Sequence, residues 1–118
     1  MIGCNYPPKQ YSIRYDGVYC NEDDQSNHYL KFSSDSTVQG LSLSGDTRNL
    51  KTIFEVPPPG IEVGRFKINI DSIEFETKCY EGVLTYKGII VDSNNLSLKI
   101  NSHINGRSSH ENFVFIKY

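Results

Sequence analysis

The chain has 118 residues, of which 37% are hydrophobic and 22% are charged, and its formal net charge is −2. This length predicts one domain that buries a core without disulfides or metals, and the apolar content argues against intrinsic disorder. Acidic and basic residues are interspersed, so no basic stripe indicates nucleic-acid binding. The apolar runs are too short to span a membrane.

The three cysteines, Cys4, Cys20 and Cys79, are widely spaced and form no C-x-x-C motif. This spacing favours neither a disulfide framework nor a zinc site, and it indicates a reducing compartment such as the cytoplasm. Ile2-Gly3-Cys4 resembles the end of a bacterial lipoprotein cleavage site, but no apolar run precedes it. A lipoprotein or exported form therefore stays open as an alternative to a cytoplasmic protein.

Eight segments show the alternation of apolar and polar side chains that is typical of half-buried β-strands. Short turn signals separate most of them, which predicts antiparallel hairpins, and residues 1–12 ahead of them are expected to form an extended arm. The expected strands are residues 13–20, 28–32, 37–43, 64–70, 73–78, 80–91, 96–103 and 109–118.

The second and third of these strands predict a hairpin in which Phe32 lies opposite Val38, with both side chains inward. That register sends Leu41 and Leu43 outward. We therefore expect a β-bulge near Gly40, which would return the leucines to the core.

The clearest alternation runs from residue 64 to residue 78. A two-residue turn at Asp71-Ser72 would pair Ile70 with Ile73 on the apolar face and Lys67 with Glu76 on the polar face. The segment therefore predicts a hairpin with one buried and one solvated face.

The final hairpin is predicted by Asn105-Gly106, because both residues accept the positive φ of a type I′ turn. This turn would pair Leu98 with Phe113 and Leu96 with Phe115, which keeps the apolar side chains on one face.

A helical period interrupts the strands only once. Asp46 or Thr47 can cap a helix in which Leu50, Ile53 and Phe54 form one apolar face. The proline-rich segment that follows ends it, because proline has no amide hydrogen to donate.

These elements predict an all-β domain that spans residues 1–118. A meander of eight strands leaves two exposed edges unless it closes, and eight strands close into a barrel that is filled by side chains or holds one small ligand. We therefore expect an eight-stranded antiparallel up-and-down barrel with one short helix between strands three and four. A two-sheet β-sandwich is the alternative.

Gly17-Val18-Tyr19 in the first strand, together with the strand order, resembles a small lipocalin-like (calycin) β-barrel protein. By this resemblance Tyr19 stands for the lipocalin tryptophan and Lys117 for the basic residue that packs over it. The chain has no tryptophan, and its helix precedes the fourth strand instead of following the last one. The resemblance implies binding of a small hydrophobic ligand inside the barrel.

Strand direction places several inward polar residues at one end of the expected barrel, beneath the helix. A pocket with apolar walls and a few convergent polar groups is the usual form of a ligand site, while simple solvation of this end is the alternative. The candidate ligand-binding residues are Leu50, Ile53, Phe54, Thr77, Cys79, Ser102, Ser109 and Glu111.

No catalytic, metal-binding or cofactor motif is expected. His103 and His110 lie diagonally on the outer face of the last hairpin, where two ligands are too few for zinc, and Cys79 has no histidine base on its own face. We therefore expect a non-enzymatic protein that binds a small apolar ligand at the helix-covered end. The alternative is a protein-interaction module with a filled barrel, either an inhibitor or a subunit of a homodimer or larger homo-oligomer.

Overall fold

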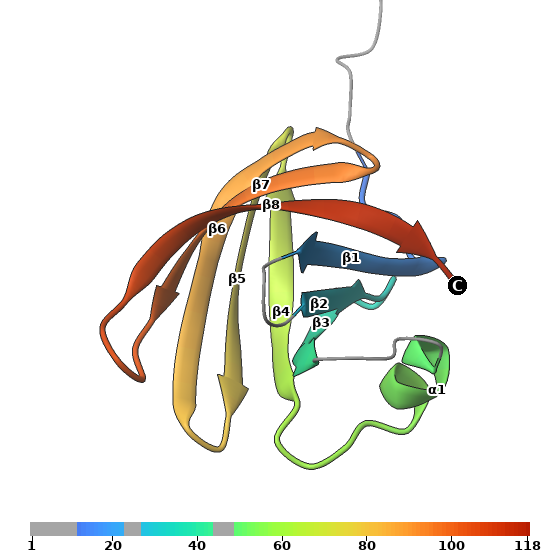
Figure 1. The fold of residues 1–118 in the computed structure, drawn as a ribbon. Helices are drawn as coiled ribbons and strands as arrows, with labels where there is room; N and C mark the ends of the chain where they lie inside the picture. The colour runs from blue at the N-terminus through green and yellow to red at the C-terminus, as the bar shows by residue number, and fades with distance from the viewer. Residues whose placement is uncertain (1–11, 23–26, 44–48) are drawn as a thin grey trace, which may run out of the picture.

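In the ranges that the computed structural model describes, residues 12–22, 27–43 and 49–118, eight antiparallel strands form one closed barrel (Figure 1). Each strand pairs with the next along the chain, and β1 pairs with β8 to close the barrel. This confirms the predicted up-and-down barrel over the sandwich. The elements are β1 Gly17–Glu22, β2 Asn27–Phe32, β3 Thr37–Leu43, α1 Leu50–Glu55, β4 Glu62–Asn69, β5 Ser72–Cys79, β6 Gly82–Asp92, β7 Asn95–Ser102 and β8 Ser108–Lys117.

The first strand begins later than the sequence suggests. Residues 12–16 flank β1 without belonging to it, yet Ile13 is buried in the main core, whereas Tyr15 is exposed. Most of the expected arm at residues 1–12 and part of the expected loop at 21–27 lie outside the described residues. In the described ranges no helix is both long and apolar enough to cross a membrane.

The barrel interior is a close-packed core in which aromatic rings meet edge to face. Tyr19, Phe66 and Phe75 surround Phe32 at ring-centre distances of 5.1–5.6 Å, and Phe75 stacks on Tyr86 at 4.4 Å. Such arrangements stabilise beyond the area they bury. The interior core is completed by Leu30, Val38, Ile73, Ile90, Leu96, Leu98, Ile100 and Phe113, with Ile13 from the flank of β1.

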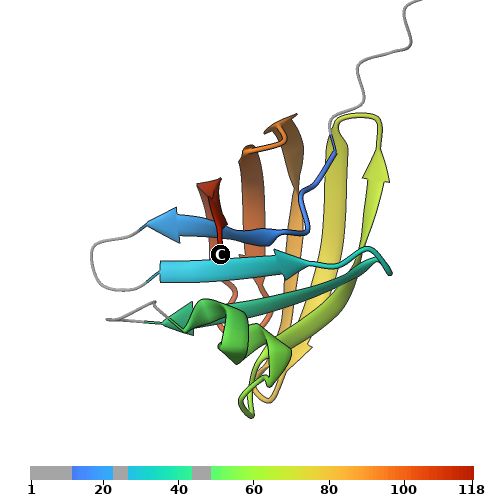
Figure 2. The same ribbon diagram turned by 90° about the vertical axis from the view of Figure 1, so that its right-hand side faces the viewer.

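A second apolar cluster lies on the outer face of β1, β2 and β3. Val18, Cys20 and Tyr29 point away from the interior, and Leu50 and Phe54 of α1 pack against them. Figure 2 shows α1 outside the barrel, beside β3. The helix has only six residues, so its stability must come from this packing. The expected cap residues Asp46 and Thr47 lie outside the described residues.

The bulge expected near Gly40 does not form. β2 and β3 stay in continuous register, with Phe32 opposite Val38 as predicted. Leu41 and Leu43 face outward because α1 supplies an apolar surface there, and both pack against the outer cluster.

Two hairpins keep the predicted faces but shift their register by two residues. The β4–β5 turn is Ile70-Asp71, so Ile68 lies opposite Ile73, and Lys67 lies opposite Glu74 instead of Glu76. Ile70 takes a φ of 61° and is 66% exposed, a conformation that β-branched residues rarely adopt. In this register Ile70 leaves the sheet instead of entering the apolar face.

The last hairpin shifts for a related reason. Gly106 has a positive φ, whereas Asn105 is not among the described residues with a positive φ, so a type I′ turn does not form. The backbone amide of Gly106 donates to the carbonyl of Ser102, which makes a wider loop. Leu96 consequently lies opposite Phe113, and Leu98 lies opposite Glu111.

Candidate functional site

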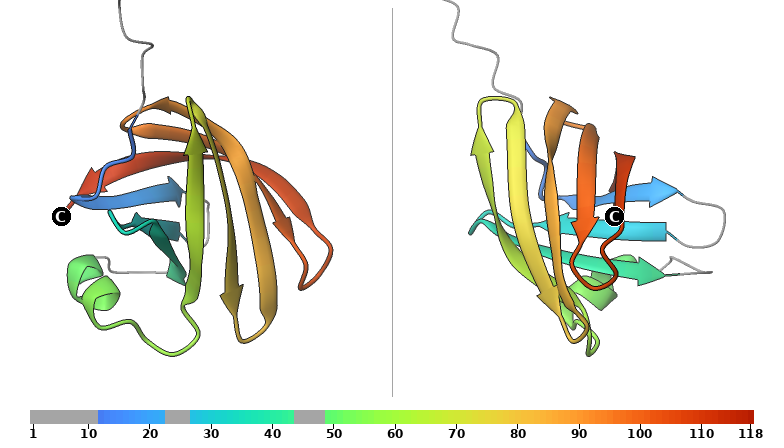
Figure 3. Two further views of the ribbon diagram at one scale, coloured as in Figure 1. Left: turned by 180° about the vertical axis from the view of Figure 1, so that it is seen from behind. Right: turned by 90° about the vertical axis from the view of Figure 1, so that its left-hand side faces the viewer.

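The two ends of the barrel differ. We call the end with the β4–β5 and β6–β7 turns the plugged end, and the end with the β5–β6 and β7–β8 turns the open end (Figure 3).

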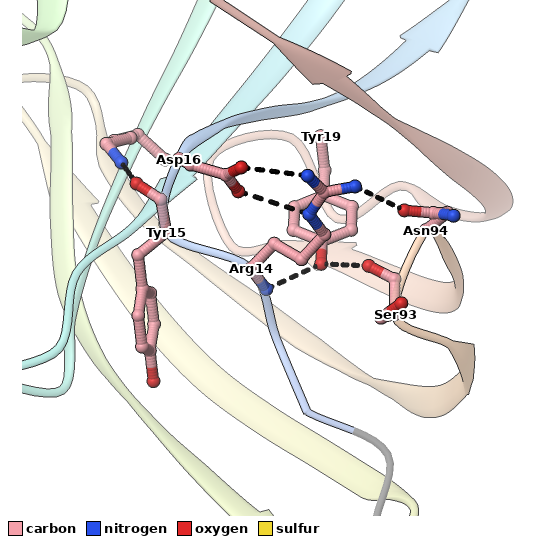
Figure 4. Close-up of polar contacts among 7 residues, drawn as sticks. Arg14, Tyr15, Asp16, Tyr19, Ser93 and Asn94 are labelled. Carbon is pink, nitrogen blue, oxygen red and sulfur yellow. Dashed lines mark hydrogen bonds and ion pairs between the residues drawn. The ribbon is translucent and has the colours of Figure 1, made fainter.

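At the plugged end, residues flanking β1 close the interior (Figure 4). The Tyr19 hydroxyl donates to the carbonyl oxygen of Ser93 at 2.6 Å and accepts from the backbone amide of Arg14 at 2.9 Å. The Arg14 guanidinium donates to the Asp16 carboxylate at 2.8 and 3.1 Å and to the side-chain oxygen of Asn94 at 2.9 Å. Burial raises the pKa of the Tyr19 phenol. These contacts tie the flank of β1 to the β6–β7 turn.

The lipocalin resemblance expects a basic residue over the ring in the Tyr19 position. The structure places a cation here, but it is Arg14: its guanidinium carbon lies 4.0 Å from the ring centre of Phe115. Phe115 in turn packs edge-on against Tyr19 at 5.2 Å. Lys117 is exposed and pairs with Gly17 in the β1–β8 ladder.

A buried polar network lies toward the open end. The Oε1 atom of Glu62 accepts hydrogen bonds from the Thr77 and Tyr86 hydroxyls, both at 2.7 Å. The Tyr86 oxygen lies 3.1 Å from the Nε2 atom of His28, and the Glu62 Oε2 atom lies 3.4 Å from the same nitrogen. Glu62 is only 8% exposed, so these hydroxyls replace the water that its carboxylate would otherwise bind.

The proton positions in this network follow from counting donors. Tyr86 has one hydroxyl hydrogen, which it donates to Glu62, so His28 must donate its own Nε2 hydrogen to the Tyr86 oxygen. Burial lowers the pKa of His28 more than the nearby Glu62 and Glu111 raise it, so the imidazole is neutral. Burial also raises the pKa of Tyr86, and the nearby Glu62 raises it further. The carboxylate of Glu62 therefore has no cationic partner in the network.

Gly40 makes room for the carboxylate. It lies opposite Glu62 in the β3–β4 ladder, and a Cβ atom at this position would lie 3.0 Å from the carboxyl carbon. A residue with a side chain would displace the Glu62 head group. The glycine thus serves the polar network and does not mark a bulge.

Two pockets open above the network, and His28 and Leu84 line both. The first, of about 370 Å³, also contains Glu62, Cys79 and Glu81 and has apolar walls from Leu41 and Ile104. The second, of about 360 Å³, contains Arg107 together with three of the predicted residues, Ser102, Ser109 and Glu111. We call the first the Glu62 pocket.

The structure separates the predicted site residues into two groups. Thr77 and Cys79 belong to the network and the Glu62 pocket, and Ser102, Ser109 and Glu111 line the neighbouring pocket. Leu50, Phe54 and the half-buried Ile53 belong to α1, which packs on the outer face of the barrel, so the expected lid over the barrel opening is wrong.

Sequence reasoning missed Glu62, His28 and Tyr86. Each stands two residues from a core or glycine position in the same alternation, as His28 does before Leu30. Extending the two-residue period past the apolar run would have placed a charged residue on an inward face, which is the available signal.

Other reactive groups in the described ranges form no catalytic or metal-binding set. Cys79 lines the same pocket as His28, but no described hydrogen bond joins them. His103 and His110 lie on the outside, next to the Thr85 hydroxyl at 3.0 Å and the Ser97 hydroxyl at 2.7 Å. No three His, Cys, Asp or Glu side chains of the described residues gather as a metal site would require.

Comparisons with known proteins add no relative. No protein family matches the chain, and neither a curated protein nor a solved structure matches it.

The buried histidine predicts a specific loss of stability in acid. The pKa of His28 lies below the ordinary value of about 6.5, so below this pH the unfolded chain binds a proton that the native chain excludes. The free energy of unfolding should therefore fall from about pH 6.5 downward, with this one group contributing up to about 1.4 kcal/mol per pH unit. In urea unfolding at pH 7.5, 6.5 and 5.5, His28→Gln should show a shallower decline than the wild type.

The matched control is His103→Gln, which removes an exposed histidine of the same open end. It should leave the decline unchanged. Equal slopes in the wild type and His28→Gln would show that His28 is not held neutral by burial.

Proposed function

We propose that the protein is a non-enzymatic, lipocalin-like binding barrel that holds a small ligand with an apolar part in the Glu62 pocket at its open end. The observation that carries this proposal is the buried network of Glu62, Thr77, Tyr86 and His28. A buried carboxylate rarely adds stability compared with an apolar core residue. Its placement on the wall of a pocket gives it a role in recognition instead.

Three further features support this assignment. Leu84 and Ile104 provide apolar walls beside the polar groups, which is the usual lining of a small-molecule site. The opposite end is closed by Arg14 and Tyr19. The aromatic core fills the interior between the two ends, so the ligand is small and does not thread the barrel.

A screen of fatty acids, isoprenoids, tetrapyrroles and alkylamines by thermal shift tests the proposal, together with native mass spectrometry of mildly purified protein. A ligand present at ten times its Kd should stabilise the native state by about 1.4 kcal/mol, which raises the Tm of a domain of this size by about 5 °C. Cys79→Trp, which fills the Glu62 pocket, should abolish the shift.

Lys78→Trp is the matched control because Lys78 is the adjacent residue on β5 and points outward. It should retain the shift. No carried ligand and no Tm change above about 1 °C for any compound would count against the proposal.

A second candidate is an interaction module or homodimer, which exposed apolar side chains on β8 favour. Val114 and Ile116 are 52% and 40% exposed and lie with Cys20 along a groove on the outer face. The same thermal experiment separates the two candidates. A surface on β8 would gain no stability from small ligands, and Cys79→Trp would leave its partner binding intact.

A further inference from the structure

The charges around the Glu62 pocket are one-sided. Glu62 and Glu81 contribute two carboxylates, and no lysine or arginine is among the described residues of the lining. His28 does not offset them, because its pKa is lowered by burial and its ring is neutral. Arg107 lines the neighbouring pocket, where it accompanies Glu111.

One carboxylate oxygen of Glu62 has no hydrogen-bond donor among the described residues. Its Oε1 atom accepts both described hydroxyl hydrogens of the network, which fixes the orientation of the head group. Its Oε2 atom accepts no hydrogen bond from a described residue and lies 3.4 Å from the His28 nitrogen, beyond ordinary N–H···O length. A side chain that is nine-tenths buried thus keeps one carboxylate oxygen without a described hydrogen-bond donor, in a pocket that it lines.

We propose that the ligand of the Glu62 pocket is a small primary alkylamine whose ammonium group binds the Oε2 atom of Glu62. This inference rests on the proposed function and narrows it to one chemical class. An ammonium supplies the donors and the positive charge that the pocket lacks, and hydrogen bonds between charged partners are about twice as strong as neutral ones. The alkyl part would lie against Leu84 and Ile104.

The same arrangement disfavours fatty acids and other carboxylates. A ligand carboxylate in this pocket would face Glu62 and Glu81 with no described basic residue to pair with it. Its binding would bring like charges close together, which is unfavourable. An alcohol would find a hydrogen-bond acceptor but no charge partner.

Isothermal titration calorimetry with three six-carbon probes tests the inference: hexylamine, 1-hexanol and hexanoate at pH 7.5. The wild type should bind hexylamine at least tenfold more tightly than either other probe. Glu62→Gln should reduce hexylamine affinity to within about threefold of 1-hexanol. Glu76→Gln, which removes an exposed carboxylate from the outer face of β5, should retain the full preference.

The probe series on the wild type decides even where Glu62→Gln folds poorly. Similar affinities for hexylamine and 1-hexanol, or a preference for hexanoate, would overturn the amine inference and leave the binding barrel in place. Failure of all three probes to bind would overturn the inference. If the wider ligand screen still gives a Tm shift that Cys79→Trp removes, the proposed function stands. If it gives none, the result also counts against the proposed function.

Discussion

Phe54→Ala should destabilise the protein by about 3–5 kcal/mol in chemical denaturation, because truncating a buried aromatic side chain leaves a cavity as well as lost burial. Phe54 is 5% exposed and closes the outer cluster over Val18, Cys20 and Tyr29. α1 is too short to hold itself together without that contact. The variant should leave ligand affinity at the open end unchanged, since the helix packs on the outer wall.

Thr52→Ala is the matched control, since Thr52 is an exposed residue of the same helix. It should change the free energy of unfolding by less than about 0.5 kcal/mol. A loss below about 1 kcal/mol for Phe54→Ala would mean that α1 contributes little to stability. Weakened ligand retention would contradict the expectation that the outer cluster acts independently of the open end.

Gly88→Ala should destabilise the barrel by about 3 kcal/mol, at the upper end of ordinary overpacking effects. A Cβ atom at Gly88 would lie 1.9 Å from the carbonyl oxygen of Ser97 and 2.8 Å from the Cα atom of Leu98. Both contacts are with the backbone of β7, so the ladder itself must move. A glycine in a strand interior often marks such a close approach of a neighbouring backbone segment.

Lys87→Ala, at the adjacent exposed position of β6, is the control and should change stability by less than about 0.5 kcal/mol. Urea unfolding of both variants measures the difference. Alanine restricts the unfolded chain more than glycine does, which alone would stabilise by about 0.4–1 kcal/mol. A stabilised Gly88→Ala protein would therefore rule out the close approach of β6 and β7.

Alternation predicted the strands well because burial of one face fixes which residues point inward. Phe32 and Val38 lie opposite each other as expected. The two shifted hairpins have a common physical cause: a slip of two residues preserves every side-chain face, so the hydrophobic pattern cannot choose between the registers. The turn then decides the register. The observed turn gives Ile70 a positive φ, which the sequence disfavours because β-branched residues rarely adopt that conformation.

The helix illustrates a different limit. Its apolar face was predictable from Leu50 and Phe54, but its docking surface was not, because Leu41 and Leu43 were assumed to belong inside. Once a barrel has an apolar patch on its outer wall, strict alternation fails there. A β-bulge near Gly40 is needed only if Leu41 and Leu43 face inward, and the packing of α1 on the outer wall removes that need.

The polar end was predicted in part. Thr77 and Cys79 were placed by strand direction, which depends only on the order of the hairpins. Glu62 was missed because it stands at the first residue of β4, before the apolar run begins. Its polar contacts depend on Tyr86 and His28, which belong to other strands, and a single sequence gives no sign of such a tertiary contact.

The closure of the barrel by β1 and β8 has a consequence for the order of folding. Gly17 pairs with Lys117, across 100 residues of chain, whereas the other ladders join consecutive strands. Closing a loop of this length costs about 3 kcal/mol more conformational entropy than closing a short hairpin. We therefore expect β1 and β8 to pair late in folding, after the other ladders have formed and while the outer edges of these two strands are still unpaired. Until that step is complete, those edges are the part of the chain most open to pairing with another molecule.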